Sequence, residues 1–124
     1  MTSHVEQIFR QEMLKLRSQY IQHSLSQLQT VRSVLQRWDQ PLLDMEELTQ
    51  LMVIAHKLRG SGKTYDLPEV TSWAGLLESD LKTVLDNPQR LTPERRRTLL
   101  SIVTRLHSIM SAAARQDREE RIES

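Results

Sequence analysis

The chain has no cysteine, and its 124 residues include only three glycines, four prolines, two tryptophans, two tyrosines and one phenylalanine. The lack of thiols excludes disulfides, thiolate metal sites and cysteine nucleophiles. Few glycines and prolines beside abundant Leu, Gln, Arg and Glu favour helix almost throughout and argue against β architectures. The low aromatic content also argues against a base-stacking surface for nucleic acid.

Long apolar runs and an excess of one charge are missing as well. No segment approaches the roughly 18 apolar residues of a membrane span, and the start, MTSHVEQIFRQEM, is too polar for a signal peptide. Seventeen Lys and Arg against sixteen Asp and Glu give a net charge of +1, without the basic surplus of a DNA-binding domain. We therefore expect one cytoplasmic domain that binds neither nucleic acid nor membrane.

Apolar residues recur at helical spacing in four blocks. The blocks cover about residues 5–38, 44–65, 68–86 and 93 onward. The breaks between them are Asp39-Gln40-Pro41, Asp66-Leu67-Pro68 and Asp86-Asn87-Pro88. Asp44 and Thr92 are predicted N-caps, and Pro68 and Pro93 suit a first helical turn. The prediction is an all-α, antiparallel up-and-down four-helix bundle over 1–114, followed by a charged tail or linker helix over 115–124.

The first block carries two apolar strips about 100° apart. One strip contains Phe9, Met13, Leu16, Tyr20, Val31, Leu35 and Trp38, and the other contains Leu14, Ile21, Leu25 and Leu28. Two strips indicate a helix with two neighbours inside a bundle or, alternatively, a helix with a dimer face; a monomer is the expectation. The inward faces of the other blocks are predicted to include Leu48, Leu51, Met52, Ala55, Leu58, Gly62 and Tyr65, then Val70, Trp73, Ala74, Leu77, Leu81 and Val84, and finally Leu99, Val103, Leu106, Met110 and Ala113.

Two of the three glycines, Gly60 and Gly62, lie inside the second block, where each costs about 1 kcal/mol relative to alanine. At 100° per residue, Gly62 faces the core, where it allows two helices to approach closely. Gly60 lies one turn beyond His56 on an outward stripe that also contains Val53. The missing side chain at position 60 leaves the imidazole accessible to a large partner, and Val53 offers that partner an apolar contact.

Lys57, Arg59 and Lys63 surround His56 with positive charge in the sequence. Such a setting favours a phosphoryl group or an acidic partner. A lone histidine on a helix is also an ordinary surface residue, so the residues alone leave both interpretations open.

The sequence gives little support for a nucleotide-binding, metal-binding, hydrolase or nucleic-acid-binding site. Gly60-Ser61-Gly62-Lys63-Thr64 is similar to a phosphate-binding loop, but Lys57 occupies the place of the first glycine and no strand precedes it. The four histidines form no His-x-x-x-His pair, which argues against a metal site. No nucleophile elbow of a serine hydrolase is present. The run Glu94-Arg95-Arg96-Arg97 is typical of a solvated helix start rather than a nucleic-acid patch.

The segment His56-Lys57-Leu58-Arg59-Gly60-Ser61-Gly62 resembles the signature of histidine-containing phosphotransfer (Hpt) domains of bacterial multistep phosphorelays. The resemblance continues through Tyr65, Asp66-Leu67-Pro68 and Trp73-Ala74-Gly75-Leu76-Leu77-Glu78, covering about residues 55–78. It implies a four-helix bundle with the phosphoacceptor histidine on the second helix. Asp66 stands where the family commonly has glycine, and aspartate tolerates the left-handed backbone conformation.

By this resemblance His56 is the phosphoacceptor, Gly60 gives receiver domains access to it, and Arg59 contacts the phosphoryl group or the partner's acidic site. The implied function is relay of a phosphoryl group between receiver aspartates, without autonomous kinase activity. The implied partners are receiver domains of hybrid histidine kinases and response regulators, and the family is often fused to receiver or diguanylate cyclase modules. The chain needs no cofactor of its own, because the receiver supplies Mg²⁺. The alternative is an adaptor or inhibitor that binds a receiver or kinase without passing phosphate.

Overall fold

The computed structural model describes residues 3–38 and 44–123. The described residues form four α-helices and no strand. The helices are α1 (His4–Arg37), α2 (Met45–Ser61), α3 (Pro68–Asp86) and α4 (Pro93–Glu123), and the short 3₁₀ turns are η1 (Lys63–Tyr65) and η2 (Pro88–Arg90). The all-α prediction is confirmed.

The helix starts follow from their capping residues. The Asp44 carboxylate accepts hydrogen bonds from the backbone N–H groups of Glu46 and Glu47 at 2.9 and 3.3 Å. The Thr92 hydroxyl accepts one from the N–H of Arg95 at 3.1 Å. Both predicted caps are thus confirmed, and each satisfies amide groups that have no partner within the helix. The predicted break at 39–41 lies outside the described residues.

One predicted boundary is wrong. The second block was expected to stay α-helical to Tyr65, but α2 ends at Ser61 and the chain tightens into η1. The turn then closes through Asp66, which has a left-handed backbone with φ 59° and ψ 43°. Aspartate accepts this conformation more readily than most residues, so a glycine is not required here.

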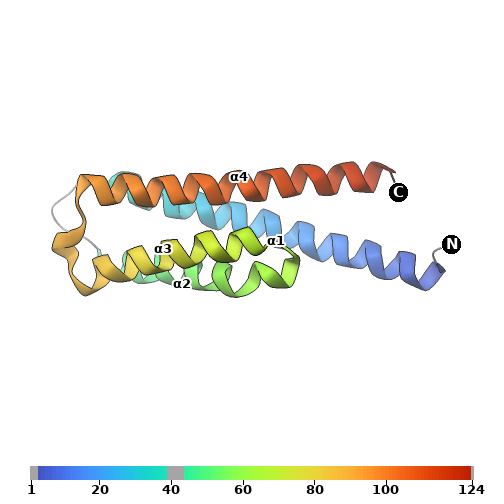
Figure 1. Ribbon diagram of the computed structural model, residues 1–124, viewed down its shortest axis with the longest axis horizontal. Helices are drawn as coiled ribbons and strands as arrows, with labels where there is room; N and C mark the ends of the chain where they lie inside the picture. The colour runs from blue at the N-terminus through green and yellow to red at the C-terminus, as the bar shows by residue number, and fades with distance from the viewer. Residues whose placement is uncertain (1–2, 39–43, 124) are drawn as a thin grey trace.

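Figure 1 shows the four helices along one long axis, with successive helices traversing it in opposite directions. α2 packs mainly against α3, α1 against α4, and α3 also against α4. The N-terminal part of α1 and the C-terminal part of α4 project past the end of the α2–α3 pair (Figure 1). No helix among the residues described is long and apolar enough to cross a membrane.

The core is built from aliphatic side chains of all four helices. Its largest fully buried members are Ile21, Leu28, Val31, Leu35, Leu48, Leu51, Leu58, Leu77, Leu81, Leu99, Leu106 and Met110. Burial of each such side chain contributes about 1.5–3 kcal/mol. The predicted inward faces of α2, α3 and α4 are largely confirmed, although Met52, Tyr65 and Trp73 are only half-buried.

The first apolar strip of α1 is only partly in the core, contrary to the prediction. Phe9, Met13 and Leu16 are 67%, 43% and 48% exposed. The α2–η1 segment ends where the Arg17 guanidinium donates to the Tyr65 carbonyl at 2.9 Å and the Tyr20 ring stacks on the Tyr65 ring at 4.1 Å. The exposed residues precede this point on α1, so they lie beyond the α2–η1 segment that covers the later turns.

The charged segment after residue 114 continues α4 without a break. Within it, Asp117 is only 4% exposed, and its carboxylate pairs with the Arg17 Nε at 2.9 Å. The pairing joins the C-terminal part of α4 to α1 and, through the Arg17 bond to Tyr65, to η1. The domain boundary at residue 114 stays a prediction.

Gly62, the C-cap residue of α2, packs tightly against the start of α3. A Cβ atom at this position would lie 2.5 Å from the Thr71 hydroxyl oxygen and 2.8 Å from the Thr71 backbone nitrogen. Neither distance is tolerable without movement, and the backbone nitrogen cannot rotate away. The predicted role of Gly62 in close helix packing is confirmed.

We expect Gly62→Ala to lower the free energy of unfolding by about 1–3 kcal/mol, because the added methyl group overpacks this contact. Urea denaturation followed by circular dichroism measures the change. Gly60→Ala is the matched control, since a Cβ there meets no atom within 4 Å and alanine is the better helix former. Equal stability of the two variants would contradict the assignment of Gly62 to a packing role.

Candidate functional site

His56 lies in the fourth turn of α2 and presents its ring to solvent. Its side chain is 75% exposed, and its Nδ1 is 2.8 Å from Oε2 of Glu78. An ionised carboxylate can only accept a hydrogen bond, so Nδ1 carries the ring proton. In the neutral ring Nε2 then holds a free lone pair, and no hydrogen bond engages this atom among the residues described. The arrangement orients an exposed nitrogen nucleophile.

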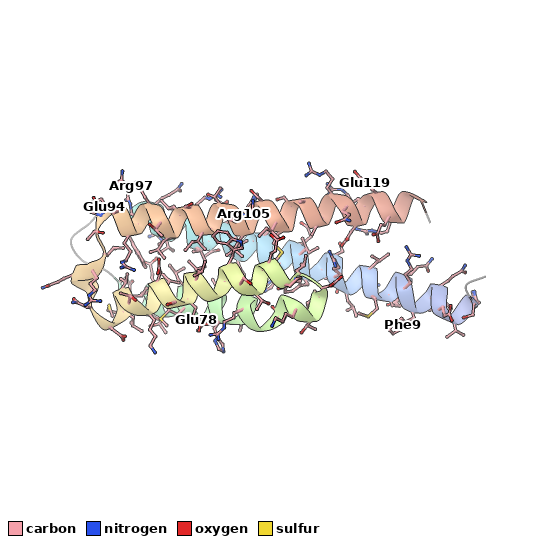
Figure 2. The ribbon with its side chains drawn as sticks, in the orientation of Figure 1. Phe9, Glu78, Glu94, Arg97, Arg105 and Glu119 are labelled. Atoms are coloured by element: carbon pink, nitrogen blue, oxygen red, sulfur yellow. The ribbon has the colours of Figure 1, made fainter. Side chains whose placement is uncertain are left out.

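Glu78 comes from α3 and bridges two residues of α2. While Oε2 accepts from His56, Oε1 accepts from Nη1 of Arg59 at 3.0 Å. Its side chain is 18% exposed, whereas the Arg59 side chain is 56% exposed. Figure 2 labels Glu78 in the α2–α3 half of the molecule, away from the projecting ends of α1 and α4. Two charge-assisted hydrogen bonds hold the carboxylate in one orientation beside the imidazole.

The Arg59 side chain crosses α3 at Gly75. A Cβ at position 75 would lie 3.8 Å from the Arg59 Cδ, so the arginine stem passes directly over this glycine. The guanidinium reaches Glu78 from there and remains partly exposed near the imidazole.

The surface beside His56 is open, as Gly60 and Val53 predict. A Cβ at Gly60 would meet no atom within 4 Å, and Val53 is 47% exposed. Since residues four apart lie on the same helix face, the missing side chain at position 60 leaves the ring uncovered on its C-terminal side. A second protein can approach this face closely.

The other predicted cations do not join the hydrogen-bonded group. Lys57 and Lys63 are exposed, and no ion pair or hydrogen bond in the described part of the chain links either to His56 or Glu78. Their backbones have local roles: the Lys57 carbonyl accepts from the Ser61 hydroxyl at 2.6 Å, and the Lys63 N–H donates to the Thr71 hydroxyl at 3.1 Å. The lysines add positive charge at longer range, while the direct contact of His56 is an anion that the sequence-based site omitted.

The spacing of residues around the α2–α3 turn could have indicated that Glu78 lies beside His56. His56 precedes Leu67 by eleven residues and Glu78 follows it by eleven. In a helical hairpin, residues equidistant from the turn lie opposite each other. The contact between Arg59 and Gly75, eight residues to either side of Leu67, has the same register.

The imidazole of His56 lies at the surface, where its side chain is 75% exposed. A cavity of about 710 Å³ lies where α1 and α4 meet the α2–α3 turn, and its lining includes Arg17, Asp66 and Asp117 but not His56. The part of the chain described here contains no group of three or more His, Asp or Glu side chains placed to hold a metal ion. An exposed ring nitrogen suits chemistry on a group that a partner protein presents.

A family model described as the Hpt domain matches residues 7–117. Searches of curated proteins and of solved structures each gave no match. The matched range contains His56 and Glu78 and extends over most of the four-helix structure. Domains of this kind are phosphotransfer intermediates of two-component systems, are not autonomous kinases, and generally interact with receiver domains. The chain therefore belongs to the histidine-containing phosphotransfer (Hpt) domain family.

Proposed function

We propose that this chain relays phosphoryl groups between receiver domains, with His56 as the phosphoacceptor on the second helix of an up-and-down bundle. The observation that carries the proposal is the Nδ1 contact with Glu78, which leaves Nε2 of an exposed imidazole free as a nucleophile. The family match over residues 7–117 supports the same chemistry.

In the proposed reaction, Nε2 of His56 attacks the phosphorus of an aspartyl phosphate on the receiver. The new bond is Nε2–P, and the bond that breaks joins phosphorus to the aspartate oxygen, which leaves as a carboxylate. The nucleophile needs no base, because the ring proton is already on Nδ1. Transfer to a second receiver reverses these steps with another aspartate.

The receiver supplies the remaining parts of the reaction in this proposal. Mg²⁺ held by the receiver neutralises charge on the phosphoryl group, while this chain contributes positioning. Gly60 and Val53 provide the surface against which the receiver docks. Arg59, Lys57 and Lys63 attract its acidic site, and Arg59, which binds the same Glu78 carboxylate as His56, contacts the transferred group in this proposal.

The test is phosphoryl acceptance by the purified chain from a panel of phosphorylated receivers. We expect a label that is stable in base and labile in acid, as phosphohistidine is. Binding to a receiver without acceptance would instead support the adaptor or inhibitor function. Neither transfer nor binding across the panel would count against both functions.

A further inference from the structure

We propose that Glu78 keeps the phosphorylated ring of His56 protonated at Nδ1, so that phosphohistidine in this chain is short-lived and passes its phosphoryl group on rapidly. The inference rests on the proposed function and concerns the phosphorylated state of the same site. Glu78 acts here as a positioning residue, since it contacts the imidazole and not the phosphorus.

The charge on the ring follows from the tautomer. Attack by Nε2 of a ring that is protonated on Nδ1 produces a ring with a phosphoryl group on one nitrogen and a proton on the other. That ring is a cation until Nδ1 loses its proton. The Glu78 carboxylate, 2.8 Å from Nδ1, forms an ion pair with this cation, and an opposite charge within about 4–6 Å favours the charged form of a group.

The protonation state of Nδ1 decides how easily the P–N bond breaks. When phosphorus leaves a ring that still has its Nδ1 proton, the bonding electrons return to Nε2 and the product is neutral imidazole. When Nδ1 is deprotonated, the leaving group is the much more basic imidazolate. The acid lability of phosphohistidine has the same origin. A carboxylate that retains the Nδ1 proton at neutral pH therefore extends this lability to neutral pH.

The neighbouring cations oppose the effect of Glu78 without cancelling it. Arg59 binds the other carboxylate oxygen at 3.0 Å and offsets part of its charge. Lys57 and Lys63 on the α2 side and Lys82, one turn after Glu78 on α3, are exposed, and no hydrogen bond among the described residues joins any of them to the imidazole. Coulomb energy falls with distance and with solvent screening, so the direct contact with Glu78 dominates.

Glu78→Gln separates charge from orientation. Glutamine has nearly the same shape, and its amide oxygen can still accept the Nδ1 hydrogen bond, but it has no charge to hold the proton on a phosphorylated ring. Asp80→Asn is the matched control, because it removes one negative charge two residues away on α3. Asp80 pairs with Arg95 of α4 at 3.6 Å.

The experiment uses phosphoramidate, a small phosphoryl donor, to phosphorylate the wild-type chain and both variants without a receiver. After removal of the donor, ³¹P NMR follows the decay of phosphohistidine across a pH series, and ¹⁵N NMR of ring-labelled protein reports Nδ1 protonation. We expect several-fold slower decay at neutral pH in Glu78→Gln, with Nδ1 deprotonated, and convergence with the wild type in acid. Asp80→Asn should match the wild type, and Glu78→Asp should restore part of the decay rate.

Equal lifetimes and equal Nδ1 protonation in the wild type and Glu78→Gln would overturn this inference while leaving His56 as the phosphoacceptor. A failure of phosphoramidate to produce phosphohistidine at His56 in the wild type would instead overturn the proposed function, and this inference with it. The ¹⁵N readout distinguishes loss of the charge from a general disturbance of the site.

Discussion

His56→Gln is expected to abolish phosphoryl acceptance and to leave the fold nearly unchanged. Glutamine has no nucleophilic ring nitrogen, so no phosphohistidine can form at this position. The side chain is 75% exposed, and substitutions at exposed positions usually change stability by no more than about 0.5 kcal/mol. Transfer of label from a phosphorylated receiver measures the first effect, and urea denaturation measures the second.

His23→Gln is the matched control, because His23 is an exposed histidine on α1 and has no part in the proposed site. It should accept phosphate at the wild-type rate. Acceptance by His56→Gln, or its loss in His23→Gln, would show that the phosphoacceptor has been misassigned.

Gly60→Leu is expected to reduce receiver-dependent transfer by orders of magnitude while preserving the helix. A leucine at this position projects into the space that a docking receiver would occupy, one turn from His56. Leucine is also favoured over glycine in a helix by nearly 1 kcal/mol, and nothing lies within 4 Å of the added Cβ. The variant should therefore be at least as stable as the wild type.

Phosphorylation by phosphoramidate distinguishes a loss of receiver docking from a loss of reactivity at His56. The small donor does not need the docking surface, so it should still phosphorylate His56 in Gly60→Leu at a rate near that of the wild type. Gly60→Ala should lose far less receiver-dependent transfer, because its methyl group occupies little of the same space. If Gly60→Leu accepts phosphate normally from receivers, docking does not use this face of α2.

Much of the α2–α3 half of the molecule could be predicted from local signals. Asp44 and Pro68 mark helix starts, and the 100° period places Gly62 inward and Gly60 on the stripe of His56. These features depend on residues within one helix or one turn. Local sequence therefore sufficed to place His56 on an outward face and to predict the open surface beside it, whereas its role as phosphoacceptor was implied by the family resemblance.

The features that escaped prediction depend on how whole helices align. Glu78 contacts His56 because the turn at Leu67 sets the register of α2 against α3, and a charge survey limited to residues near His56 does not include α3. Phe9 and Met13 have the spacing of core residues, but whether a strip is covered depends on how far the neighbouring helix extends. At the early end of α2, the Lys63 N–H donates to the Thr71 hydroxyl of α3, a contact between segments that local sequence does not predict.

The exposed N-terminal part of α1 should open its backbone hydrogen bonds more easily than the rest of the helix. Residues 4–16 bury little surface, so that stretch is held mainly by its own hydrogen bonds and by the reciprocal bonds of Ser3 and Glu6. Isolated helices of this length are marginal in water. We therefore expect amide hydrogens before Leu16 to exchange by local fraying, and those after Tyr20 to exchange only when the core opens. Hydrogen exchange measured by NMR would show α1 as one continuous helix with two separate levels of protection.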